Sequence, residues 1–190
     1  LDEFIDSDSC RPLLTKAKLT EQIAGLGATR GVLEDWVSRE IVDPLGKTLT
    51  DRKIPLSRTR AYCDEGWVVS LGDIVHADVK TEGVVHYGNG MFTLPFSLDI
   101  LADVWFYMHF DDVLLFKSLD SDSINIIDFT DDYSQVSVTA DVRVVGTASL
   151  RADLERIQQS ESGDNLREVL MSAQLDIDSI DEVKVVGAFD

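Results

Sequence analysis

Hydrophobic and polar residues alternate most regularly between residues 134 and 150. The even positions of this stretch are mainly small or branched apolar residues, and the odd positions are mainly polar. A period of two predicts a β-strand with one buried face and one polar face. Because ordinary strands stop near about ten residues, we expect this one to bend. Gly146 is the expected position, since a missing side chain permits a bulge or kink.

Two further stretches show the same alternation, residues 67–79 and residues 98–110. In the second, the even positions are apolar throughout and are predicted to lie in the core. Pro95 lacks an amide hydrogen, so it predicts an edge position or a break between a strand at 91–96 and the strand that follows.

Helical spacing of apolar residues marks both ends of the chain. Near the N terminus, Thr29 is a suitable N-cap for a helix that Pro44 is expected to stop. Near the C terminus, residues 151–159 have helical spacing, and Asp164 is a candidate cap for a further helix.

This order of helices, strands and helices is typical of an α+β protein. We expect a curved antiparallel sheet of about 5–7 strands with N-terminal and C-terminal helices packed on it, because each main strand has one strongly apolar face. Residues 1–60 form a predicted helical segment with a basic loop at 47–60, and residues 61–190 an acidic, β-rich body. At 190 residues, both parts fit one compact domain.

The charge is strongly negative and unevenly distributed. The formal net charge is -18, and because the charges of residues 1–60 cancel, all of it belongs to residues 61–190. Such a field repels nucleic acid and anionic membranes and attracts basic proteins or cations. We therefore expect a basic protein partner and no direct nucleic-acid binding. A solubilising surface in a salt-adapted organism is the alternative explanation of the acidity.

Several sequence patterns limit the possible cellular location of the protein. The most apolar window, residues 98–116, contains four aspartates, so no membrane span is expected. Cys10 and Cys63 form neither a disulfide framework nor a metal motif. Together with the lack of a signal-peptide pattern, this cysteine usage predicts a cytoplasmic protein.

The best candidate site is the second face of the strand at 98–110, where Asp103, Trp105, Tyr107 and His109 alternate with apolar residues. On a strand these side chains project to one side, so they can line one surface together. Aromatic rings supply stacking area, and Asp with His supplies acid–base capacity. Three interpretations remain open: a face covered by helices, an exposed patch that docks a partner, and a small-molecule or catalytic pocket.

Clustered aspartates suggest a second site, which would bind a divalent metal. The candidate ligands lie in or beside two expected turns, Asp111-Asp112 and Thr130-Asp131-Asp132, and are Asp111, Asp112, Asp128, Asp131 and Asp132. Carboxylates around a metal ion support phosphodiester hydrolysis, although Asp is also common in turns and caps.

No nucleotide-binding glycine motif, P-loop or nucleophile elbow is present in the sequence. We therefore favour a non-enzymatic, acidic interaction domain that binds a basic protein, of the inhibitor, immunity or accessory-subunit type. The alternatives are a metal-dependent phosphoester hydrolase or nuclease and a small-molecule pocket on a curved sheet. No cofactor is expected apart from the divalent metal of the hydrolase hypothesis, and the oligomeric state stays open.

Overall fold

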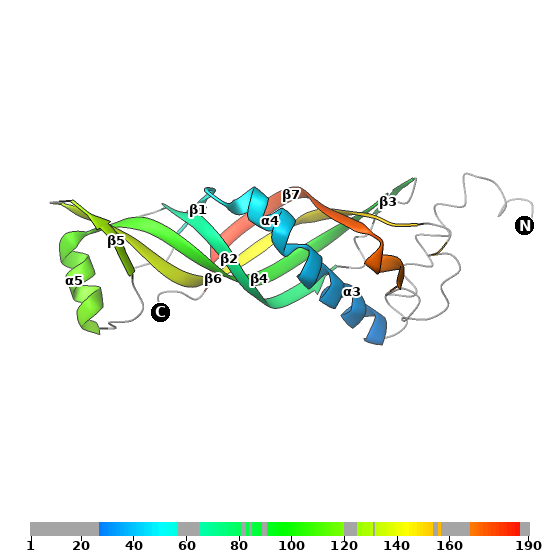
Figure 1. Ribbon diagram of the computed structural model, residues 1–190, viewed down its shortest axis with the longest axis horizontal. Helices are drawn as coiled ribbons and strands as arrows, with labels where there is room; N and C mark the ends of the chain where they lie inside the picture. Colours follow the sequence, from blue (N-terminus) through cyan, green and yellow to red (C-terminus); the bar gives the residue numbers. More distant parts are fainter. Residues whose placement is uncertain are drawn as a thin grey trace, which may run out of the picture. The chain divides into compact units, whose positions relative to one another are not determined.

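The structure is a computed structural model (Figure 1). It describes residues 27–56, 65–80, 83, 85–88, 91–119, 125–130, 132–153, 156 and 168–186. Its labelled helices are α3 (Gly27–Glu40), α4 (Val42–Leu49) and α5 (Phe110–Leu119). Its strands are β1 (Lys53–Pro55), β2 (Glu65–Val79), β3 (Val85–Gly88), β4 (Met91–His109), β5 (Asn125–Phe129), β6 (Tyr133–Arg151) and β7 (Gln174–Val185).

The strands form one seven-stranded sheet with the order β1-β2-β4-β6-β5, in which β3 also pairs with β4 and β7 with β6. The pairs β1–β2, β3–β4 and β5–β6 are antiparallel. Side-chain contacts indicate that β4 and β6 are also antiparallel, since Asp103 bonds to Thr139 while the earlier residue Asp99 bonds to the later residue Arg143. The predicted antiparallel sheet is therefore confirmed, and the protein is broadly α+β with few helices.

The chain divides into two compact units that do not follow the order of the sequence. Unit 1 consists of Leu1–Pro44, Ala77–Ser97 and Val145–Asp181. Unit 2 consists of Leu45–His76, Leu98–Val144 and Glu182–Asp190. The long strands β2, β4, β6 and β7 each contribute residues to both units. The division at residue 60 that the sequence suggested stays a prediction.

Each unit has a buried core on the apolar side of its strands. In unit 2, the even positions of β4 from Leu98 to Met108 are at most 1% exposed, and Val138, Val142 and Val144 of β6 are buried as well. In unit 1, the apolar residues with little exposure include Trp36, Val37, Phe92, Phe96, Ala148, Leu150, Val169 and Leu170. The alternation that predicted one buried face on β4 and β6 is confirmed.

Two expected breaks do not occur. β4 continues through Pro95 as one strand of 19 residues, so the predicted separation into two strands is wrong. Pro44 does not stop a helix but lies in the first turn of α4, where a missing amide hydrogen costs no helical bond. The preceding helix α3 ends nearby, and the amide of Ile41 donates to the carbonyl of Val37 over 2.9 Å.

Two other local details also differ from the expectation. Phe110, assigned to the buried face of a strand, is 39% exposed, because β4 ends at His109 and α5 begins. The expected Asp111-Asp112 turn is the first turn of α5, where carboxylates stabilise the positive end of the helix.

β2 does not keep the strict alternation expected over residues 67–79. Trp67 stacks on Trp105 and Ser70 bonds to Asp103. The two contacts are therefore three residues apart along β2 but only two residues apart along β4. One extra residue on one strand of an antiparallel pair is the arrangement of a β-bulge. As a consequence, residues of β2 on both sides of the bulge reach the polar face of β4.

Candidate functional site

The four residues of the predicted face all lie at odd positions of β4 and project on the side opposite its buried core. They alternate with Val104, Phe106 and Met108, which are fully buried. The predicted residues keep contact with solvent, and the side chain of Tyr107 is 45% exposed. We call the side of the sheet that carries Asp103, Trp105, Tyr107 and His109 the polar face.

Asp103 is held in the middle of the polar face by hydroxyl groups from both neighbouring strands. Ser70 on β2 donates to Oδ2 and Thr139 on β6 donates to Oδ1, each over 2.7 Å. These hydrogen bonds, with that from Ser70 the larger effect, lower the pKa of Asp103 below its ordinary value despite partial desolvation. The carboxylate is therefore a fixed negative charge at neutral pH.

Trp105 belongs to an aromatic cluster with Trp67 and Tyr107. The indole rings of Trp67 and Trp105 are stacked, with centroids 4.2 Å apart and planes 9° from parallel. Tyr107 presents its ring edge-on to both, with centroids 5.4 Å from Trp105 and 6.4 Å from Trp67. Such stacked and edge-to-face pairs contribute beyond the area they bury and fix the orientation of the rings.

A cation lies against this aromatic cluster. Nζ of Lys53 on β1 is 5.1 Å from the centroid of the Trp67 ring and 2.7 Å from Oε2 of Glu65. Strand pairing explains the placement, because Lys53 lies opposite Trp67 in the register of β1 and β2. Lysine over an indole face is a cation–π contact. Lys53 belongs to the basic segment 47–60 and pairs here with an acidic residue.

His109 lies at the end of β4 and does not join Asp103 in one acid–base pair. Its ring is edge-on to Tyr133 of β6 at 5.8 Å between centroids. Its Nδ1 is 3.9 Å from Oδ2 of Asp111, and both side chains are largely exposed. The four predicted residues thus share a face but divide into three local groups around Asp103, the aromatic cluster and His109.

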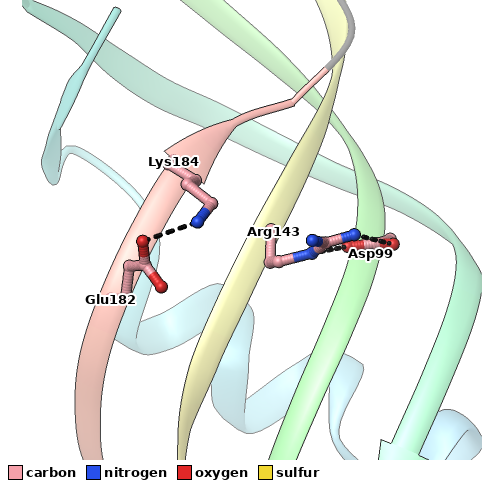
Figure 2. A network of polar contacts seen from close by, with 4 residues as sticks. All are labelled: Asp99, Arg143, Glu182 and Lys184. Atoms are coloured by element: carbon pink, nitrogen blue, oxygen red, sulfur yellow. Dashed lines mark hydrogen bonds and ion pairs between the residues drawn. The ribbon is translucent and has the colours of Figure 1, made fainter. Parts of the chain in front are cut away.

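The same face carries an ion pair between β4 and β6. Arg143 donates from Nε to Oδ1 of Asp99 over 2.7 Å and from Nη2 to Oδ2 over 2.8 Å. Figure 2 shows Arg143 directed toward Asp99, while Glu182 and Lys184 pair with each other on β7 over 2.8 Å. The bidentate hydrogen bonds from Arg143 lower the pKa of Asp99, and that carboxylate raises the pKa of the Arg143 guanidinium.

The predicted metal ligands are not gathered around one point in the part of the chain that the structure describes. Asp128 accepts a hydrogen bond from the amide of Phe129, and the carbonyl of Asp132 accepts one from the amide of Phe110. The second bond places the start of α5 beside the turn before β6. Among the described residues, no three His, Cys, Asp or Glu side chains could hold a metal ion together. Asp131 lies outside the described residues, so the full set stays a prediction.

Sequence reasoning missed the residues that neighbouring strands contribute to the polar face. Trp67, Ser70 and Thr139 were assigned to strands, but their partners depend on the register between strands. Glu65 and Lys53 were likewise not connected to any aromatic residue. The only sequence signal was the presence of polar and aromatic residues on neighbouring strands, which does not specify which ones meet.

No protein-family model, curated protein or solved structure matches this chain. Within the described ranges, no helix has both the length and the apolar character needed to cross a membrane.

Proposed function

We propose that this chain is a non-enzymatic interaction domain that binds a basic protein through its polar face, as an inhibitor, immunity protein or accessory subunit would. The observation that carries the proposal is the aromatic cluster of Trp67, Trp105 and Tyr107, whose tyrosine is 45% exposed in a molecule with a net charge of -18. Exposed Trp and Tyr residues are typical anchors of protein interfaces.

The arrangement around the aromatic cluster favours a cationic partner. Asp103 lies on the same face of β4 and supplies a negative charge, and the hydrogen bonds from Ser70 and Thr139 hold its carboxylate in place and lower its pKa. Complementary charge accelerates encounter and selects partners, while aromatic side chains supply the contact area. A surface that only kept the protein soluble would not need partly exposed, stacked indoles.

The remaining parts of the proposal concern the surroundings of this face. We infer that the N-terminal and C-terminal helices pack on the apolar side of the sheet. The burial of Trp36 and Ile41 near the N terminus and of Val169 and Leu170 near the C terminus supports this packing. We also propose a cytoplasmic location, which the cysteine usage supports.

The test is a calorimetric titration with an arginine- and lysine-rich peptide at low and high salt, with an oligoglutamate peptide as the negative control. We expect binding of the basic peptide that weakens as salt rises, because exposed charges are screened. Tyr107→Ala should weaken binding by about fivefold or more, as expected for an aromatic interface anchor.

Met171→Ala is the matched control, because Met171 is a large hydrophobic residue that is 74% exposed and lies on neither β2 nor β4. It should leave the affinity unchanged. Absence of salt-sensitive binding would contradict the proposed function. Equal affinities of the Tyr107→Ala and Met171→Ala variants would show that the basic peptide does not bind through the polar face.

The two alternatives have less support. The hydrolase hypothesis needs converging carboxylates, and none of the described acidic side chains forms a group of three that could hold a metal. The small-molecule hypothesis needs Asp103, Trp105, Tyr107 and His109 to line one pocket, yet Asp103 and His109 contact different residues.

A further inference from the structure

The outer side of the aromatic cluster is occupied by the chain's own Lys53. Its Nζ lies 5.1 Å from the centroid of the Trp67 ring and 2.7 Å from Oε2 of Glu65. Because β2 lies between β1 and β4, Lys53 approaches Trp67 from the side opposite Trp105. Trp67 and Glu65 therefore form a cation-binding site that the ammonium group of Lys53 occupies.

Lys53 is weakly held at this place. The side chains of Lys53 and Glu65 are 57% and 55% exposed, and such surface ion pairs contribute little to stability. Lysine also has a long, flexible stem that loses rotamer freedom when it is held in one position. Another cation can therefore replace it at small cost.

We propose that an arginine side chain of the basic partner displaces Lys53 from Trp67 and pairs with Glu65. A guanidinium fits this pair of groups better than an ammonium, because it is planar, stacks on an indole and bonds to a carboxylate in two places. The strongly negative chain attracts such a partner. This inference rests on the proposed function and adds the partner's residue type and an internal competitor for the same site.

The competition has a measurable consequence, because removing Lys53 should strengthen binding. We would compare Lys53→Met with Lys47→Met, which removes the same charge from an exposed position on α4. Both variants are titrated with an oligoarginine peptide and with an oligolysine peptide of equal length. We expect Lys53→Met to bind oligoarginine about two- to fivefold more tightly than Lys47→Met does, the range of one exposed cation–π contact.

Glu65→Gln tests the carboxylate without removing its shape. It should weaken oligoarginine binding more than Asp73→Asn, which neutralises an exposed carboxylate on the same strand. Circular dichroism melts would confirm that all four variants fold, and neither pair relies on truncating a tryptophan.

The outcomes separate the two levels of the proposal. If basic peptides bind but the matched variants of each pair behave alike, the displacement of Lys53 is wrong while the proposed function stands. Equal affinity of the wild-type protein for oligolysine and oligoarginine also overturns the choice of arginine. If no basic peptide binds in a salt-sensitive way, both proposals fail.

Discussion

Single residues in this protein are constrained most where two strands approach each other closely. Gly146 on β6 is an example, because an added Cβ would collide with the carbonyl oxygen of Ser179 and come within 3.2 Å of Cζ of Phe96. Glycine at this position is explained by the nearness of another backbone. Ser134 differs, since its hydroxyl is buried and has no hydrogen-bond partner among the residues that the structure describes.

Gly146→Ala should therefore destabilise the protein by about 2 kcal/mol or more, because backbone atoms must shift to admit the methyl group. Gly46→Ala is the control, since no described residue beyond its chain neighbours and the local backbone of α4 lies within 4 Å of an added Cβ at that position. The control should stabilise the protein by about 0.5–1 kcal/mol through helix propensity. Urea unfolding of both variants measures the difference, and equal effects would contradict the close approach.

Among the elements, β4 is tied to both of its neighbours by polar contacts on one face. Asp103 accepts hydrogen bonds from β2 and β6, and Asp99 accepts the bidentate pair from Arg143 on β6. These cross-strand contacts select one register, because a slip of one residue would turn the carboxylates toward the buried side. The polar face thus has a structural role as well as the proposed binding role.

These contacts predict how stability depends on pH. The pKa values of Asp99 and Asp103 are lowered in the folded protein, for Asp99 mainly by the Arg143 hydrogen bonds and for Asp103 mainly by Ser70. Their contribution is present above the ordinary value of 3.8 and is lost as pH falls through the lower folded values. Asp99→Asn and Asp103→Asn should each flatten the loss of stability with acid in chemical unfolding.

Asp176→Asn is the control for this measurement, because it removes an exposed carboxylate from β7 instead of from β4. We expect it to leave the acid dependence close to that of the wild-type protein. If Asp99→Asn and Asp103→Asn kept the acid dependence of the wild-type protein, these hydrogen bonds would not lower the carboxyl pKa values in the folded chain relative to the unfolded chain.

At the scale of the whole molecule, the net charge of -18 dominates. Self-repulsion of this kind destabilises the compact state while it keeps the protein in solution. The ion pairs Lys53–Glu65 and Lys184–Glu182 are solvent-exposed, so they offset little of this repulsion.

Moderate concentrations of sodium chloride should therefore raise the melting temperature, because screening weakens the repulsion more than it weakens the few ion pairs. A relief of about 1 kcal/mol would correspond to about 2–4 °C for a protein of this size. Calorimetric melts over a salt series measure this shift. A melting temperature that fell with salt would mean that attractive pairs outweigh the repulsion.

The sequence by itself determined which face of each long strand is buried. Alternation of apolar and polar residues placed Val142 and Phe106 in the core, and the same alternation placed Trp105 and Tyr107 on one surface. This succeeds because burial of apolar side chains is a local property of a strand with a period of two.

The tertiary structure decided which strands meet and in which register. The stacking of Trp105 on Trp67, the lysine over that stack and the hydroxyls on Asp103 join residues that are distant in sequence. The bulge in β2 and the continuity of β4 through Pro95 also depend on neighbouring strands. Pairing between strands is a long-range choice that depends on all the contacts made together, and a local pattern of residues does not contain it.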